Sequence, residues 1–258
     1  MNVYLKASLI GDTVCAINCI EALALLDSYK GLSLNLKVEN PALKIFFKHI
    51  QGINFTDEIM SDMIVLSPHD FLNEGQSLGL HMTQGYFLQA KLNVPTLTKP
   101  NIIWEKTNKN IPVYDYIIAP YSWSDLSDEK LWAYSNWQDV INYLKSKDKD
   151  VKIAVLGASG FALEKNQNKQ IFYNVDYIFD KPLEYVCELI FKTKLALTID
   201  NGISHLVHGI GTPHILLYPE CLNQNWVKNF NDNARVIRAQ PSLITVQNVI
   251  DKIEEAVN

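Results

Sequence analysis

The sequence predicts an α/β protein with two parallel sheets, one in each half of the chain. Short strands alternate with helical segments in both halves, and each half opens with a strand, a polar turn and a helix. Several strands are apolar throughout, which is typical of parallel strands covered by helices on both faces. The 258 residues also exceed the usual size of one domain, so we expect two.

The first half is expected to form a β-α-β series. Asn2 to Ser8 is predicted as a strand, Gly11-Asp12-Thr13 as the turn that breaks it, and Val14 to Leu26 as a helix, because apolar residues recur there at helical spacing. Asp12 or Thr13 is expected to cap this helix. The other predicted elements are strands at 32–38, 53–55 and 63–66 and helices at 41–47 and 79–92.

The periodic pattern is lost between Val94 and Pro112, where three prolines interrupt the sequence VPTLTKPNIIWEKTNKNIP. This composition is typical of an interdomain linker. We therefore predict a first domain at 1–110, with the linker starting at about residue 94, and a second domain at 111–258.

A compact β-α-β unit organises the second half. A strand at 195–198 is followed by the polar break Asp200-Asn201-Gly202, a helix at 203–210, the stop Gly211-Thr212-Pro213 and a strand at 214–218. Ligands of open parallel sheets bind beside helix N-termini at the carboxyl ends of strands, so this unit predicts a phosphate site. The other predicted elements are strands at 114–119, 152–156 and 177–179 and helices at 132–144, 183–192 and 242–257.

Composition and charge exclude several classes of protein. The chain is 48% hydrophobic and 20% charged, which excludes disorder, and no apolar run approaches the roughly 20 residues of a membrane span. The N-terminus lacks the basic start and cleavage site of a signal peptide. The net charge of −5 disfavours nucleic acid and anionic membranes as partners. We expect a soluble, cytoplasmic protein whose four cysteines, without a C-x-x-C pair, are buried and reduced.

Polar residues that follow predicted strands are the candidates for chemistry. Asp12 could cap its helix or act as a general base, and the neighbouring sequence does not decide between the two roles. Lys130 could be an exposed lysine or could meet phosphate charge. Ser122 and Ser124 could offer hydroxyls to the same phosphate or only form a solvated turn.

Asp200, Asn201, Gly202 and His205 form the strongest set. The N–H groups of Gly202 and Ile203 would point at a phosphate, and His205 would lie one helical turn beyond. The alternative is a plain turn followed by a core histidine.

Other kinds of site are disfavoured. Asp148-Lys149-Asp150 has the D-x-D form of some metal sites, but its run of alternating charge is typical of a solvated loop. There is no G-x-G-x-x-G for a dinucleotide and no G-x-S-x-G for a hydrolase. His208 and His214 are interpreted as structural.

The ordered set of these segments resembles glycosyltransferase family 9, the heptosyltransferase-like enzymes. The matching segments are Ile10-Gly11-Asp12-Thr13-Val14, Lys130-Leu131-Trp132 with Trp137, Val155-Leu156-Gly157, Pro182-Leu183-Glu184, Asp200-Asn201-Gly202-Ile203-Ser204-His205 and Gly211-Thr212-Pro213. The resemblance implies a GT-B fold, in which two Rossmann-like parallel-sheet domains face a central cleft, here with a reduced first domain.

The resemblance further implies an inverting, metal-independent enzyme for hexosyl or heptosyl transfer, without a cofactor. It would move a sugar from a nucleotide-diphosphate sugar to a hydroxyl of a glycan, glycolipid or protein acceptor. The domain at 1–110 would bind the acceptor and the domain at 111–258 the donor. The implied roles are catalytic base for Asp12; donor binding for Ser122, Ser124, Lys130, Asp200, Asn201, Gly202, Ile203 and His205; and the nucleobase and ribose side for Glu164 and Lys181.

Two departures from the family pattern leave an alternative open. Asn201 stands where the family has Ser or Thr, so a phosphate-facing hydroxyl is missing, although an amide can donate a hydrogen bond. The first domain is also short. The alternative is a non-catalytic GT-B-like nucleotide-binding or assembly module. A nucleotide-sugar epimerase ranks last, because the acid/base carboxylates and histidines expected in one pocket are lacking.

Overall fold

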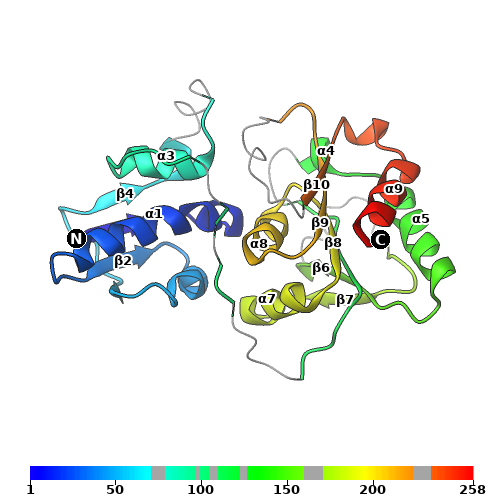
Figure 1. Cartoon of the computed structure of the whole chain (residues 1–258), viewed down its shortest axis with the longest axis horizontal. Coiled ribbons are helices and arrows are strands. Elements are labelled where there is room, and N and C mark those ends of the chain that lie inside the picture. Colours follow the sequence, from blue (N-terminus) through cyan, green and yellow to red (C-terminus); the bar gives the residue numbers. More distant parts are fainter. Residues whose placement is uncertain are drawn as a thin grey trace. The chain divides into compact units, whose positions relative to one another are not determined.

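The computed structural model describes residues 1–70, 79–96, 99–100, 102–104, 110–122, 127–159, 171–222 and 234–257. The chain divides into two compact units, whose described residues lie within 1–103 for the first and within 104–222 and 234–257 for the second. Each unit contains its own sheet (Figure 1). The predicted α/β class with two parallel sheets is confirmed.

The first unit contains a four-stranded sheet in the order β3-β2-β1-β4, with every pairing parallel. Helix α1 packs against α3 and against a 3-10 helix, η1. The bounds are β1 (Asn2–Leu5), α1 (Ile10–Ser28), β2 (Leu34–Val38), η1 (Pro41–Phe47), β3 (Ile53–Phe55), β4 (Ile64–Leu66) and α3 (Met82–Gln89).

Helix α1 begins earlier than the sequence predicts. Its N-cap is Leu9, whose side chain makes no capping hydrogen bond, and Asp12 lies in the first helical turn. The Thr13 hydroxyl donates to the carbonyl oxygen of Leu9 at 2.9 Å, so it bonds back along its own helix. The prediction that Asp12 or Thr13 caps the helix is therefore wrong.

The second unit contains a six-stranded sheet in the order β10-β9-β8-β5-β6-β7, again with every pairing parallel. From β5 the chain adds β6 and β7 on one side and then β8, β9 and β10 on the other. This is the doubly wound order, and its switch point lies between β5 and β8. The bounds are β5 (Tyr116–Ala119), β6 (Ile153–Gly157), β7 (Asp176–Phe179), β8 (Leu195–Ile199), β9 (His214–Tyr218) and β10 (Ala234–Arg238).

Helices cover both faces of this sheet. Helices α7 and α8 lie together on one side, and α5 and α9 lie together on the other (Figure 1). The bounds are α4 (Ser127–Lys130), α5 (Tyr134–Lys147), α7 (Leu183–Lys192), α8 (Gly202–Ile210), the 3-10 helix η3 (Pro241–Leu243) and α9 (Val246–Val257).

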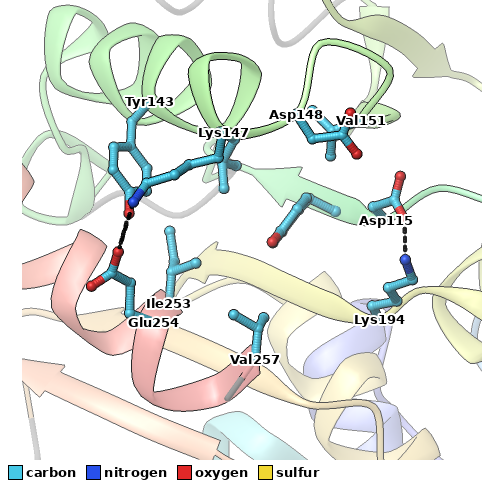
Figure 2. A pocket seen from close by; sticks show the side chains of 11 residues that line it. Asp115, Tyr143, Lys147, Asp148, Val151, Lys194, Ile253, Glu254 and Val257 are labelled. Carbon is cyan, nitrogen blue, oxygen red and sulfur yellow. Dashed lines mark hydrogen bonds and ion pairs between the residues drawn. The ribbon is translucent and has the colours of Figure 1, made fainter.

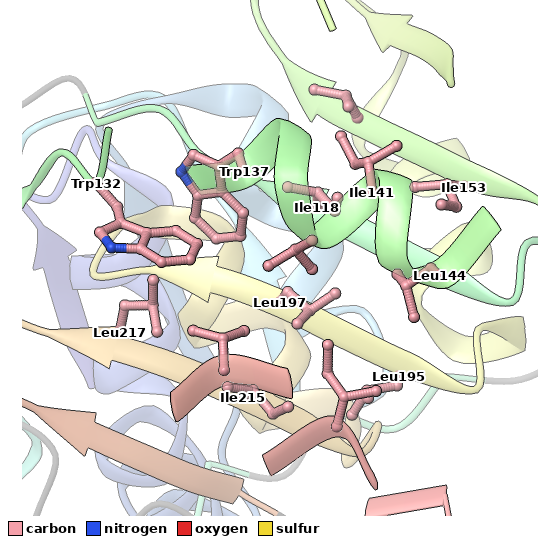
Figure 3. Packing of buried hydrophobic residues seen from close by; sticks show 14 of the residues in the cluster. Ile118, Trp132, Trp137, Ile141, Leu144, Ile153, Leu195, Leu197, Ile215 and Leu217 are labelled. Carbon is pink, nitrogen blue, oxygen red and sulfur yellow. The ribbon is translucent and has the colours of Figure 1, made fainter. Parts of the chain in front are cut away.

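A tryptophan pair fixes the chain close to the candidate site. Trp132 and Trp137 meet edge to face with ring centroids 5.0 Å apart, in a core that includes Ile118 and Leu197 (Figure 3). The Trp132 indole N–H also donates to the carbonyl oxygen of Ile244 at 2.8 Å. Because Trp132 is held by packing and by a hydrogen bond, the backbone two residues earlier, at Lys130, is held as well.

Several elements differ from those that the sequence predicts. The strand β10 was not predicted, the helix predicted at 132–144 runs from Tyr134 to Lys147, and Lys130 belongs to a separate short helix, α4. The helix predicted at 242–257 starts at Val246, after η3. Within the part of the chain that the structure describes, no helix is both long enough and apolar enough to cross a membrane.

Candidate functional site

Helix α8 begins at the switch point of the second sheet, directly after β8. Asn201 is its N-cap, and the Asn201 side-chain oxygen accepts the N–H of Ser204 at 2.9 Å. The Ser204 hydroxyl oxygen accepts the N–H of Asn201 at 3.3 Å, which completes a capping box. Gly211, with φ 93°, ends the helix in the left-handed conformation that glycine adopts without strain.

The amide of Asn201 also joins α8 to the neighbouring strand. Its Nδ2 donates to the carbonyl oxygen of Ala119 at 3.0 Å and to that of Tyr121 at 2.8 Å. Ala119 is the last residue of β5, so these bonds cross the switch point between β5 and β8. The start of α8 and the segment after β5 are therefore tied together.

Three residues predicted as donor-binding lie together, and two of them form a buried ion pair. Lys130 Nζ lies 2.6 Å from Asp200 Oδ2, and the two side chains are only 10% and 9% exposed. His205 Nε2 lies 4.0 Å from Asp200 Oδ1. Burial lowers the pKa of His205 and outweighs the opposing effect of the Asp200 charge, so the imidazole is neutral at pH 7.

This arrangement suits an anion. A lysine ammonium has three N–H donors, so Lys130 keeps donors beyond the one given to Asp200. The first N–H groups of a helix lack intrahelical partners, and Asn201 takes that of Ser204. The N–H groups of Gly202 and Ile203 then stand at the positive end of the α8 dipole, where a phosphate is favoured.

Gly157 and Tyr121 support the segment after β5, a role for which the sequence carries only weak signals. Gly157 ends β6, and a Cβ at this position would lie 2.9 Å from the Tyr121 ring and 3.1 Å from that of Phe179. The Tyr121 and Phe179 rings meet edge to face with centroids 6.1 Å apart. The glycine therefore makes room for an aromatic side chain that packs on the segment after β5.

The remaining predicted donor-side residues are dispersed. Ser122 is buried directly after Tyr121, whereas Ser124 and Glu164 lie outside the described residues. Lys181 follows β7, with its ammonium 6.0 Å from the ring centroid of Tyr185. β7 is three strands from β8, which is about 14 Å at the usual spacing of parallel strands. Lys181 is therefore not part of the group around Asp200.

Asp12 lies at the start of the helix that follows the central strand β1 of the first unit, as Asn201 lies at the start of α8 after β8 in the second. It lies in the first turn of α1, after β1, and β1 stands between β2 and β4, where the order of that sheet reverses. Burial and the Asp12 charge both raise the pKa of Tyr86, which is fully buried on α3. Asp12 thus stands at a second switch point, the usual place for a ligand in such sheets.

The cysteines differ in exposure. Cys15, Cys19 and Cys187 are buried free thiols, as predicted, but Cys221 is exposed. It follows β9, and its Sγ lies 3.3 Å from Glu129 Oε2, one residue before Lys130. Within the described residues, no group of three or more His, Cys, Asp or Glu side chains is placed to hold a metal ion.

A pocket of about 320 Å³ lies at the opposite edge of the second sheet, beside the first residues of β5 and β8 (Figure 2). Four of its five charged side chains form ion pairs, since Lys194 lies 2.6 Å from Asp115 and Lys147 lies 3.3 Å from Glu254. Because ligands of such sheets bind at the carboxyl edge, this pocket does not belong to the candidate site.

A doubly wound parallel sheet with polar residues at its switch point is typical of α/β proteins that bind a ligand there. Residues 92–251, which are 160 of the 258 residues, match the protein family Glycosyltransferase family 9 (heptosyltransferase). The chain therefore belongs to glycosyltransferase family 9. The predicted family is confirmed.

Individual relatives are distant. Lipopolysaccharide heptosyltransferase 1 of Salmonella typhimurium is 28% identical over 94 residues, which are 35% of this chain and 28% of that enzyme. The chain thus aligns with less than a third of the length of this curated relative.

Solved structures support the fold. Heptosyltransferase WaaC of E. coli, solved with ADP, has a TM-score of 0.66 at 15% identity, with all of both chains covered. The iron-containing dodecameric glycosyltransferase TibC of E. coli has a TM-score of 0.64 at 13% identity, over 84% of this chain and 57% of that one.

Proposed function

We propose that this protein is a glycosyltransferase that moves a sugar from a nucleoside-diphosphate sugar to an acceptor hydroxyl. Membership of family 9 supports the reaction class. The observation that carries the proposal within the molecule is the Lys130–Asp200 pair beside the first N–H groups of α8. Lys130 and the N–H groups of Gly202 and Ile203 supply hydrogen-bond donors for the diphosphate of a donor.

The donor side stabilises the leaving group. As the bond between the anomeric carbon and the phosphate oxygen breaks, negative charge grows on the diphosphate. Lys130 and the N–H groups of Gly202 and Ile203 are fixed donors for that charge, and fixed donors cost little reorganisation during the reaction. Asp200 orients the Lys130 ammonium, and the neutral His205 offers a hydrogen bond to the sugar or phosphate without adding charge.

The acceptor side activates the nucleophile. The Asp12 carboxylate takes the proton of the acceptor hydroxyl as the oxygen attacks the anomeric carbon. One bond to that carbon forms while the bond to the diphosphate breaks, so the reaction is a single displacement that inverts the anomeric configuration. The products are the glycosylated acceptor, the nucleoside diphosphate and a proton on Asp12.

We further propose that no metal ion is required, because Lys130 and the α8 dipole can supply the positive charge that a divalent cation gives to other transferases. The similar TibC is described as iron-containing, so the proposal needs a direct test. Transfer in the presence of EDTA should match untreated enzyme, and added iron(II) or magnesium should not raise the rate. A loss of transfer with EDTA that iron or magnesium restores would overturn metal independence.

The donor is tested first by thermal shift with UDP, ADP, GDP and CMP and with their sugars. A ligand at 100 times its Kd stabilises the folded state by about 2.7 kcal/mol, which is readily measured. ADP and ADP-heptose are the first compounds to try, because the similar WaaC was solved with ADP. Loss of nucleotide binding on Lys130→Ala would place the ligand at the α8 site.

Asp12→Asn tests the base. A removed general base typically costs 10² to 10⁴ in rate, so we expect transfer to fall by about that factor while nucleotide affinity stays within twofold. Glu21→Gln, an exposed acidic position on the same helix, is the matched control and should retain activity. Unchanged transfer by Asp12→Asn would exclude the proposed base.

A wild-type protein that binds a nucleotide but neither transfers nor hydrolyses any sugar in the panel would favour the non-catalytic binding or assembly module. In that case Asp12→Asn would also leave every measured property unchanged.

A further inference from the structure

The Asn201 side chain has no N–H donor left for a ligand. An asparagine amide has two N–H groups and one oxygen. The two N–H groups go to the carbonyl oxygens of Ala119 and Tyr121, and the oxygen accepts the N–H of Ser204. A phosphate needs a donor, so in this structure the Asn201 side chain has none to offer to the phosphate that the family resemblance implies at this position.

The three bonds join segments that lie far apart in the chain. Ala119 and Tyr121 are 82 and 80 residues before Asn201, and they belong to β5 and the segment after it. Tyr121 is held a second time, because its ring packs over Gly157. The segment that leads to Ser122 is therefore fixed to the first turn of α8.

We propose that Asn201 is a positioning residue that locks the segment after β5 against the N-terminus of α8. The lock holds the two sides of the phosphate site in place before the donor binds, so ordering them does not weaken binding. The functional part of this inference rests on the proposed function. The hydrogen bonds of the lock do not, since their effect on the melting temperature can be measured without any nucleotide.

Substitutions at Asn201 separate three roles. Ser caps a helix about as well as Asn but cannot reach both carbonyl oxygens, and Asp keeps the shape and the cap but turns an oxygen toward them. If Asn201 were only a cap, both variants would behave as wild type. If its amide met phosphate, Asn201→Asp would lose nucleotide binding while the melting temperature stayed unchanged.

The lock predicts a different pattern. Asn201→Ser should lower the melting temperature by roughly 4 °C, from two lost hydrogen bonds of about 1 kcal/mol each. It should also raise the Kd and KM for the nucleotide donor about tenfold with little change in kcat. Asn201→Asp should lower the melting temperature further than Asn201→Ser, because its carboxylate faces two carbonyl oxygens.

Ser204→Ala is the matched control. It removes the Ser204 hydroxyl from the capping box but leaves both amide bonds to Ala119 and Tyr121. We expect a lower melting temperature with nucleotide Kd within twofold of wild type. Wild-type stability and wild-type nucleotide affinity in Asn201→Ser would overturn the lock. Equal loss of affinity in Ser204→Ala and Asn201→Ser would do so as well, since it would trace the effect to the cap.

Failure of the proposed function gives a separate result. If wild type binds no nucleotide in the thermal-shift panel, the proposed function fails while the order of melting temperatures still tests the lock. Slow solvent exchange of the Asn201 side-chain N–H protons, measured by NMR, tests the same bonds without any ligand. Rapid exchange of both protons would overturn the lock in that case.

Discussion

Lys130 and Asp200 form an ion pair in a largely buried place. Removing one partner of a buried ion pair leaves an uncompensated charge, and this typically costs more than the pair itself contributes. The contribution of the pair to stability is therefore measured with two variants. One variant removes only the Lys130 charge and leaves the Asp200 carboxylate without its partner, and the other removes both charges.

We predict that Lys130→Met destabilises the protein by about 3 kcal/mol, because the Asp200 carboxylate, 9% exposed, loses its partner. The double variant Lys130→Met with Asp200→Asn should recover most of that loss, since no charge remains to be compensated. Urea unfolding of the two variants measures the difference. Equal destabilisation in both would show that Lys130 contributes through packing rather than through its charge.

Asp12 shows how far a single residue can be predicted from local sequence. Its place after the first strand was predicted correctly. The N-cap of the helix was predicted wrongly, because α1 begins at Ile10 and its N-cap Leu9 has no capping side chain. A residue at the N-cap position is recognised by its type, and leucine gives no such signal.

Glycine at the end of β6 is required by a neighbouring ring rather than by backbone conformation. Gly157→Ala would place a methyl group 2.9 Å from the Tyr121 ring, which cannot retreat freely because Phe179 packs against it. We predict a destabilisation of about 1–3 kcal/mol, the usual cost of overpacking. Thermal unfolding measures it. Adding Tyr121→Leu should relieve the clash, and a double variant no better than Gly157→Ala would contradict this account.

The pair of strands β8 and β9 encloses a histidine that predicts a dependence of stability on pH. The His214 imidazole is fully buried, and its Nε2 lies 2.7 Å from the Thr198 hydroxyl. Burial lowers the pKa of His214 to about 3, against about 6.5 in an unfolded chain. Between these values the unfolded state binds a proton that the folded state does not.

Stability contributed by this histidine is therefore complete above pH 6.5 and falls as the pH drops toward 3. The slope is about 1.4 kcal/mol per pH unit, so wild type should lose about that much by pH 5.5 from this group. His214→Gln should show a pH dependence weaker by that amount in urea unfolding. His69→Gln, at an exposed position, is the control, and identical slopes for His214→Gln and wild type would refute the prediction.

Elements with clear local signals were predicted most closely. The helix at Leu183–Lys192 and the strand at His214–Tyr218 have the predicted bounds, and β8 and α8 each differ by one residue. These elements have continuous apolar runs, a regular apolar face or glycine stops. β10 was missed because Ala234–Arg238 carries arginine at two of its five positions and packs as an edge strand.

The division of the chain into two units predicts which peptides a bound donor protects from hydrogen exchange. A nucleoside diphosphate should slow backbone hydrogen exchange in peptides from 195–210 and 127–132, at the switch point of the second unit. Exchange in β1 to β4 of the first unit should remain unchanged. Mass spectrometry of exchanged peptides measures both, and protection confined to the first unit would reverse the proposed roles of the two units.

The site as a whole could be predicted only through the order of its motifs. Asp200, Asn201 and Lys130 were selected together from the sequence, and the structure places them together. The amide hydrogen bonds from Asn201 to Ala119 and Tyr121 were not predicted, because 80 or more residues separate the partners. Strand order is decided by packing among all helices and strands, so the position of the switch point carries no local signal. The apolar strands are enough to predict parallel sheets. They do not predict which side chains meet at the carboxyl ends of the strands.

The exposed thiol of Cys221 offers a spectroscopic reporter in the unmodified chain. The other three cysteines are buried, so a maleimide dye should react at this position first. Partial burial and the adjacent Glu129 carboxylate raise the pKa of Cys221, so labelling should accelerate at alkaline pH, where the thiolate forms. Because Glu129 precedes Lys130 directly, the emission of a dye at Cys221 would follow ligand binding at the Lys130 side of the site in real time.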